Sequence, residues 1–208
     1  MLYKLTDEKD HTYGGCQWGK GVTHTADGQG ELCTEHWIHA YRDPILAVMM
    51  NPIHGRYDLA LAHLWECEGE GGKDDGTKLG CTTLTTVTRM ELPTVTTEQR
   101  VRFGILCARE VHHEAVFLAW SDAWLSGQDR SEKAASAAWA AGAAGAAGAA
   151  GTAWAAWAAA WAAARAARAA AWAAAWAAWA AAWAARAKGI TVDLVAIAHE
   201  AVSGQEVR

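Results

Sequence analysis

The stretch that decides the architecture of this chain runs from residue 154 to residue 186 and reads WAAWAAAWAAARAARAAAWAAAWAAWAAAWAAR. Every residue in it that is not alanine is tryptophan or arginine. These residues follow one another at intervals of 3, 4, 4, 3, 4, 4, 3, 4 and 3, which is an 11-residue repeat. Large residues at such intervals fall on one face of an α-helix. A long helix with a single aromatic and basic face is therefore expected here.

We call the ten tryptophan and arginine residues of this segment the stripe. At about 100° per residue they lie within an arc of about 100°. A period of ~3.67 residues favours a nearly straight or gently right-handed assembly over a left-handed coiled coil. We expect the stripe to be buried, either on the protein's own body or, as the favoured interpretation, on other copies of the chain. It consists of Trp154, Trp157, Trp161, Arg165, Arg168, Trp172, Trp176, Trp179, Trp183 and Arg186.

Segments that weaken or end a helix flank the stripe on both sides. Glycine stands at every third position from residue 142 to residue 151, and each glycine costs a helix up to ~1 kcal/mol relative to alanine. A weak or bent segment is expected there, with a helical hairpin as the alternative to one helix. After the stop signal at Lys188-Gly189, the sequence ITVDLVAIAHEAV (190–202) predicts a capping helix. Its apolar face comprises Ile190, Leu194, Ile197 and Ala201.

The first 130 residues have the mixed composition of an ordinary globular body. LYKLT (2–6) and WIHAY (37–41) predict strands, and a helix that begins at Pro44 is expected to end at Asn51-Pro52. LWECEGEG (64–71) and KLGCTTLTTVTRMEL (78–92) predict an antiparallel hairpin. Helical spacing of apolar residues then predicts helices at 97–110 and 114–125, the latter with Phe117, Trp120 and Trp124 on one face.

These patterns predict an α+β fold in which a small strand-rich body is followed by helices and then by the long Ala/Trp-rich helical segment. The expected organisation is a body at residues 1–130, an assembly segment at 131–188, and a capping helix and tail at 189–208.

Charge and cysteine content restrict the partners and the compartment. The chain has a net charge of -5 and five cysteines, and the cysteines form no CxxC pair, which favours reduced thiols inside a cell. An acidic chain without a clustered basic face is a poor ligand for nucleic acid. Arg165, Arg168 and Arg186 interrupt the only long apolar run, which argues against a membrane span. We expect neither nucleic acid nor a membrane as a partner.

Several segments carry a resemblance to a known group of proteins. The chain resembles an uncharacterised domain of phage and prophage proteins that is often followed by an Ala-rich tail. The resemblance implies a location in the cytoplasm of an infected or lysogenic bacterium, and it implies no activity and no functional residues. The segments are YKLTDEKDHTYGGCQWGKGVTH (3–24), GELCTEHWIHAYRDPILAV (30–48), GILCAREV (104–111), WLSGQDRS (124–131) and DLVAIAHEAV (193–202).

Aromatic residues of the body provide the candidate ligand site. Aromatic walls with a few polar groups are typical of small-molecule sites, although core packing is the default role of each tryptophan. The predicted pocket residues are Trp18, Trp37, His39, Tyr41 and Trp65.

Cys33, His36 and His39 have the spacing C-x2-H-x2-H, which thiolate and imidazole ligands of zinc can adopt. In an extended segment, however, three-residue steps send successive side chains to opposite faces. We therefore interpret them as a core cysteine and hydrogen-bonded histidines, and predict no metal and no cofactor.

WIHAYRDPILA with LWECEGE is also similar to the middle of an ADP-ribosyltransferase fold. That resemblance implies a first-strand residue, two cleft residues and a catalytic carboxylate. Lys4 departs from the arginine or histidine of that family. The candidates are Lys4 or Tyr3, then His39 and Tyr41, then Glu66, Glu68 or Glu91.

The function expected from the sequence is that of a non-enzymatic phage or prophage accessory protein, without predicted catalytic residues. It would form homo-oligomers through the stripe and bind a host protein or a small molecule with its body. An ADP-ribosyltransferase-like enzyme and a purely structural, filament-forming protein are the alternatives.

Overall fold

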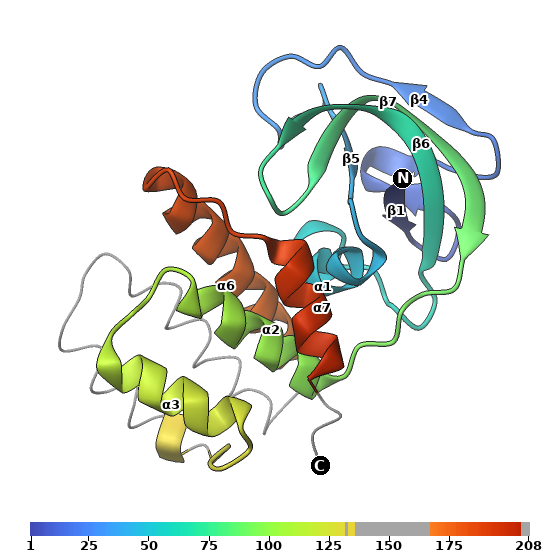
Figure 1. Ribbon diagram of the computed structural model, residues 1–208. Coiled ribbons are helices and arrows are strands. Elements are labelled where there is room, and N and C mark those ends of the chain that lie inside the picture. Colours follow the sequence, from blue (N-terminus) through green and yellow to red (C-terminus); the bar gives the residue numbers. More distant parts are fainter. Residues whose placement is uncertain (132, 136–166, 205–208) are drawn as a thin grey trace. The chain divides into compact units, whose positions relative to one another are not determined.

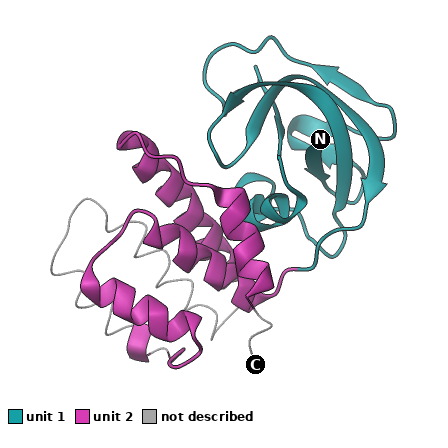
Figure 2. Ribbon diagram, viewed as in Figure 1, with its two compact units in different colours: residues 1–94 teal, residues 95–208 magenta. Residues whose placement is uncertain are grey.

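The computed structural model describes residues 1–131, 133–135 and 167–204, which fall into two compact units, residues 1–94 and residues 95–208 (Figures 1 and 2). The first unit contains a β-sheet with one α-helix, and the described elements of the second are helices. The predicted α+β class is confirmed. The helices that the sequence grouped with the body belong to the second unit, so the structural division lies near residue 94 and not near residue 130.

The first unit is built mainly from short strands and one long hairpin. Its helix is α1 (Pro44–His54), and a short 3-10 helix, η1, spans Tyr13–Gly15. Its strands are β1 (Leu2–Thr6), β2 (His11–Thr12), β3 (Cys16–Gln17), β4 (Thr23–Thr25), β5 (Ile38–Ala40), β6 (His63–Asp74) and β7 (Leu79–Met90).

The predicted hairpin is confirmed as β6 and β7, which form the long, strongly curved ribbon in Figure 1. β1 pairs with β6, and both β4 and β5 pair with β7, all antiparallel. Directly after β5, Tyr41 exchanges two backbone hydrogen bonds of 2.8 Å with Tyr3 of β1. The sheet therefore curls until β5 meets β1, and it encloses an interior.

The interior of this curled sheet is apolar and aromatic. Alternate residues of a strand point to the same face, so one side chain in two from each strand enters the interior. The buried cluster comprises Leu2, Trp18, Ala40, Trp65, Cys67, Leu79, Cys81 and Leu84.

Helix α1 begins as predicted but ends later. Asp43 caps it by accepting hydrogen bonds from the backbone N–H groups of Ile45 and Leu46, and Pro44 occupies the first turn, where its missing N–H costs little. The expected end at Asn51-Pro52 is wrong, because the helix continues to His54. Buried Asn51 binds the backbone of Tyr57 through both its amide oxygen and its amide nitrogen, which supports this last turn around the proline.

The second unit centres on α2 (Thr97–Arg109), which contacts α3 (Ala115–Leu125), α6 (Ala167–Ala187) and α7 (Leu194–Ser203). Thr96 and Gln99 form a capping box at the start of α2. Phe117, Trp120 and Trp124 are all buried on one face of α3, as their spacing predicts.

Helices α2 and α6 lie side by side (Figure 1), and their closest approach involves Gly104. A Cβ atom at Gly104 would stand 3.0 Å from the Cα atom of Ala174. This contact is possible because neither residue carries a side chain larger than a methyl group.

Helix α7 covers α2. Leu194, Ile197 and Ala201 are buried as predicted, whereas Ile190 precedes the helix and is exposed. The predicted capping helix thus makes its main contact with α2.

Part of the sequence prediction falls outside the described residues. This applies to Trp154, Trp157, Trp161 and Arg165 and to the glycine steps at 142–151, and therefore to the helical hairpin alternative. Within the described ranges, none of the helices combines the length and the apolar character needed to cross a bilayer.

Candidate functional site

The first turn of the chain contains a carboxylate with several side-chain partners, that of Asp10. Asp10 has a φ of 62°, a backbone conformation that few residues other than glycine adopt. Asp7 holds this turn by accepting hydrogen bonds from the backbone N–H groups of Lys9 and His11 at 2.8 and 2.7 Å. The Asp10 carbonyl accepts a third from the N–H of Trp18 at 2.7 Å. The strained turn directs the Asp10 side chain toward the sheet.

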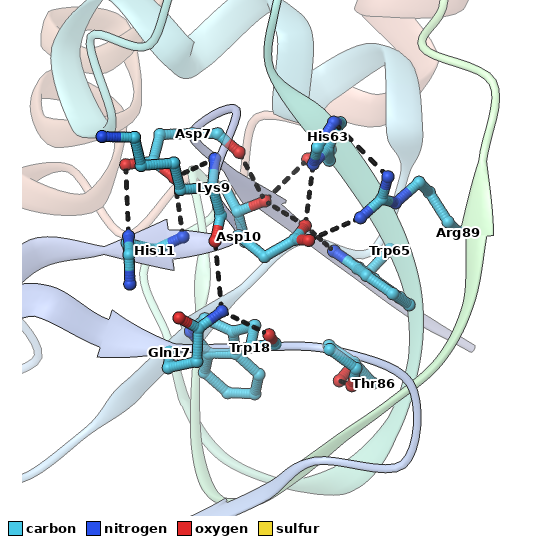
Figure 3. Close-up of polar contacts among 12 residues, drawn as sticks. Asp7, Lys9, Asp10, His11, Gln17, Trp18, His63, Trp65, Thr86 and Arg89 are labelled. Atoms are coloured by element: carbon cyan, nitrogen blue, oxygen red, sulfur yellow. Dashed lines mark hydrogen bonds and ion pairs between the residues drawn. The ribbon is translucent and has the colours of Figure 1, made fainter.

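Figure 3 shows how three side chains from the hairpin converge on this carboxylate. His63 Nδ1 donates to Asp10 Oδ1 at 2.8 Å, and Trp65 Nε1 donates to the same oxygen at 2.9 Å. Arg89 donates from a terminal guanidinium nitrogen to Asp10 Oδ2. We call Asp10, His63, Trp65 and Arg89 the Asp10 cluster.

The register of the hairpin explains why these residues meet. His63 and Trp65 are two positions apart on β6, so they lie on one face of the sheet. Trp65 and Arg89 are direct partners across β6 and β7, and the guanidinium carbon stands 5.0 Å from the centre of the indole ring. The pair forms a cation–π contact that fixes the arginine beside the histidine.

Asp10 is ionised, and this determines which nitrogen of the His63 ring donates a hydrogen bond to it. Burial raises the pKa of Asp10, but hydrogen bonds from Trp65 and His63 and the positive charge of Arg89 outweigh it, so the pKa lies below its ordinary value. A carboxylate only accepts hydrogen bonds, so Nδ1 of His63 carries the proton. The opposite nitrogen, Nε2, then presents a lone pair, and NH1 of Arg89 lies 3.5 Å from it.

A second carboxylate–histidine pair offers a comparison within the same unit. Asp27 contacts Nδ1 of His36 at 2.8 and 2.9 Å, but both residues are exposed. No arginine contact with His36 is found among the described residues. The Asp10 cluster differs in its burial, its indole donor and its arginine.

Lys4 is a buried cation in the interior of the curled sheet. Its Nζ atom donates to the His39 carbonyl at 2.6 Å and stands 5.0 Å from the centre of the Trp18 ring. Burial lowers the pKa of Lys4 to about 8. The same burial raises the pKa of the neighbouring Cys67 thiol to about 12 and that of Cys81 to about 11.

The five residues predicted to line a pocket are distributed over different environments. Trp18 and Trp65 belong to the same interior cluster. The Trp37 ring packs closely against two glycines. A Cβ atom added to Gly72 would stand 2.5 Å from the ring, and one added to Gly80 would stand 2.9 Å from it. The first two are core residues, as the default interpretation of each tryptophan expects.

His39 and Tyr41 lie on the face of β5 that points away from the interior residue Ala40. Nε2 of His39 is hydrogen-bonded to the Leu32 carbonyl. The Tyr41 hydroxyl lies 3.0 Å from Nδ1 of His54 at the end of α1. Burial lowers the pKa of His54 to about 3, so its ring is neutral.

The zinc pattern does not assemble in the structure. His36 pairs with Asp27, His39 with the Leu32 carbonyl, and Cys33 is exposed and not a core residue as we had interpreted it. Within the described ranges, no group of three or more His, Cys, Asp or Glu side chains is arranged to hold a metal.

The residues suggested by the ADP-ribosyltransferase resemblance lie on two faces of the sheet. Lys4 points into the interior, whereas Tyr3 and its cross-strand partner Glu66 occupy the other face. Glu68 and Glu91 are exposed, and Glu91 follows the end of β7. The structure thus shows one histidine-containing polar cluster, around Asp10, that this resemblance did not include.

The second unit carries a different candidate surface, the row of indoles on α6. We call Trp172, Trp176, Trp179 and Trp183 the tryptophan ladder. Successive ring centres are 5.5, 4.8 and 5.6 Å apart, and the first pair is stacked with 12° between the ring planes. The ladder lies within an arc of about 60° on one helix face.

Within the single chain, the buried face of α6 consists mainly of alanines, and burial of the stripe on other copies stays a prediction. Trp172 and Trp183 are 43% and 57% exposed, and Trp176 and Trp179 are partly buried. The stripe's Arg186 is exposed, and Arg168 lies in α6 without a described side chain. Buried residues roughly opposite the ladder are Ala170, Ala174, Ala177, Ala178, Ala181 and Ala185.

Comparison of this chain with protein-family models, with curated proteins and with solved structures gives no match. The Asp10 cluster and the tryptophan ladder are therefore interpreted from their geometry alone. Sequence reasoning found the ladder through its period, and it named Trp65 but missed Asp10, His63 and Arg89. These three belong to no local motif, because contacts of Asp10 span 53 residues to His63 and 79 residues to Arg89.

Proposed function

We propose that this protein self-assembles through the tryptophan ladder of α6 and uses its first unit to bind a host protein or a small molecule. One observation carries the proposal: the two outer indoles of the ladder, Trp172 and Trp183, remain about half in solvent, while Trp176 packs partly against the alanine-rich core of the unit. Large aromatic residues in such positions are typical anchors of protein interfaces.

The spacing of the ladder fits a second copy of the same chain. Its intervals of 4, 3 and 4 residues read the same in both directions. In an antiparallel two-fold pair, Trp172 would therefore contact Trp183 of the partner subunit. In the same way, Trp176 would contact Trp179 of the partner subunit. A two-fold interface has to be self-complementary in this way.

Area and shape also favour a pair of ladders. The outer indoles stand about 16 Å apart along the helix, and together they expose roughly the area of one whole tryptophan, ~150 to 250 Å². Alanines flank the ladder and allow close helix approach. A stable interface needs ~800 Å² from each partner, so we infer that the ladder forms the centre of a larger contact.

The setting of this assembly is part of the proposal. The resemblance of residues 1–133 to a phage and prophage domain suggests a phage or prophage accessory protein in the bacterial cytoplasm. Neither nucleic acid nor a membrane is proposed as a partner, because the chain is acidic, with a net charge of -5.

Sedimentation velocity or light scattering of the intact chain over a range of concentrations tests the assembly. The wild-type protein is expected to be oligomeric at micromolar concentration. Replacement of both exposed indoles, Trp172→Ser with Trp183→Ser, should weaken association by a factor of at least about 30, since burial of this much area is worth ~2 kcal/mol or more.

The matched control replaces two other exposed apolar residues, Leu61→Ser with Val116→Ser, which lie outside α6. This variant should associate as the wild type does. A monomeric wild-type chain at high concentration, or equal association of the ladder variant, would show that the proposal is wrong.

A further inference from the structure

The two ring nitrogens of His63 have different surroundings: Nδ1 is bound to Asp10, and Nε2 is not. Asp10 holds Nδ1 at 2.8 Å, so Nε2 is the atom left with a lone pair in the ring plane. The His63 side chain is 25% exposed.

Arg89 stands beside this nitrogen and is held there from two sides. Asp10 binds its guanidinium, and the Trp65 ring stacks against it at 5.0 Å. Its contact with Nε2 at 3.5 Å is long for a hydrogen bond, and 47% of the side chain is exposed. Guanidinium groups bind phosphate oxygens in a planar, two-pronged manner.

We propose that Nε2 of His63 accepts a phosphoryl group from an acyl phosphate, with Arg89 binding the phosphoryl oxygens. This role is separate from assembly through α6. In the step, Nε2 donates its lone pair to phosphorus, the bond between phosphorus and the acyl oxygen breaks, and the carboxylate leaves with that electron pair. The ring keeps its Nδ1 proton and becomes positively charged, and the Asp10 carboxylate stabilises that charge.

Asp10 acts here as a positioning residue. It fixes the tautomer of His63, anchors Arg89 and stabilises the charged ring after transfer. Its own strained backbone, with a φ of 62°, is the kind of feature that accompanies sites where one side chain has to be aimed.

The His36 pair supplies an internal control. His36 also meets a carboxylate through Nδ1, at 2.8 Å, but in an exposed setting. If the carboxylate alone made a histidine reactive, His36 and His63 would behave alike. The proposal assigns the difference to Arg89 and to the burial of Asp10.

The test uses acetyl phosphate and the full chain. Peptide mass spectrometry under alkaline conditions, where phosphohistidine is preserved, identifies which of the nine histidines is labelled. The expected result is labelling at His63, lost in His63→Gln and unchanged in His36→Gln. Arg89→Gln and Asp10→Asn should each slow labelling by about tenfold or more, as losses of such supporting partners do, and Arg89→Lys should retain part of the rate.

A spectroscopic measurement separates positioning from general stability. Nitrogen-15 NMR of the His63 ring should show the proton on Nδ1 in the wild type and a mixture of tautomers in Asp10→Asn, while circular dichroism shows that each variant is folded. Labelling of His36 at the rate of His63, no label at His63, or a rate that survives Arg89→Gln in a folded protein would each overturn the proposal.

Discussion

At the scale of single residues, the interior of the first unit is shaped by polar groups in an otherwise apolar setting. Asp10 and Lys4 both come from the first ten residues, and both reach partners far along the chain. Asp10 is ionised and surrounded by donors, whereas Lys4 has a carbonyl and an indole as its neighbours. The charge on Asp10 therefore stabilises the folded state, and the charge on Lys4 destabilises it.

Replacement of Lys4 by methionine tests this directly. The pKa of Lys4 is about 8 in the folded protein against 10.5 for an exposed lysine, so the unfolded chain binds more protons between these values. The free energy of unfolding of the wild type should therefore rise with pH across that window, by roughly 3 kcal/mol relative to Lys4→Met. Urea denaturation from about pH 7 to pH 10.5 measures it.

The buried thiols titrate in both proteins, so the comparison of variants reports Lys4 together with its electrostatic effect on Cys67 and Cys81. Lys20→Met, at an exposed position, should follow the wild-type pH dependence. Parallel curves for wild type and Lys4→Met would show that the amine is solvated in the folded state.

At the scale of secondary-structure elements, α6 shows the difference between predicting a helix and predicting its buried face. Alanine-rich sequence with an 11-residue period predicts the helix and the alignment of its indoles, and both hold for residues 167–187. The sequence left open whether the aromatic face is buried on the protein's own body or on other copies of the chain. Helix α2 presents Gly104 at the crossing, however, and only an alanine can meet it so closely.

Gly104→Val should separate these two helices. Glycine to alanine in a helix normally stabilises by ~1 kcal/mol, but at this position a Cβ atom would stand 3.0 Å from the Ala174 backbone. We expect Gly104→Ala to lose that gain and Gly104→Val to cost about 1 to 3 kcal/mol through overpacking. Thermal and urea unfolding measure both.

Ala119→Val on α3 is the matched control, because Ala119 is exposed and the change costs only helix propensity, below ~1 kcal/mol. Gly104→Val stability equal to that of the control would mean that α2 and α6 do not pack at this crossing.

At the scale of the whole molecule, the chain folds as two units whose boundary differs from the change in composition. The composition changes near residue 131, but α2, α3 and α6 share one buried cluster, and α7 packs on α2. Residues 91–96, between β7 and α2, form neither helix nor strand. Each unit has its own buried cluster, so each should remain folded when this connection is cut.

A protease site introduced at residues 92–94 tests this organisation. After cleavage and separation, the fragment that begins near residue 95 should retain most of the α-helical circular dichroism signal. The fragment that begins at residue 1 should retain a cooperative unfolding transition. An uncleaved variant with the same insertion is the control. Loss of either signal on cleavage would contradict two separately folded units.

The sequence by itself determined the elements of this protein. Strand-forming segments identified the hairpin, Pro44 marked the start of α1, and the spacing of apolar residues indicated α2, because these signals act between near neighbours in the chain. Only the tertiary structure decided which face of α6 is buried, where the units divide, and that Asp10 meets His63 and Arg89. Those outcomes depend on contacts across 53 to 79 residues and on steric fit at single positions such as Gly104, and neither leaves a periodic trace in the sequence.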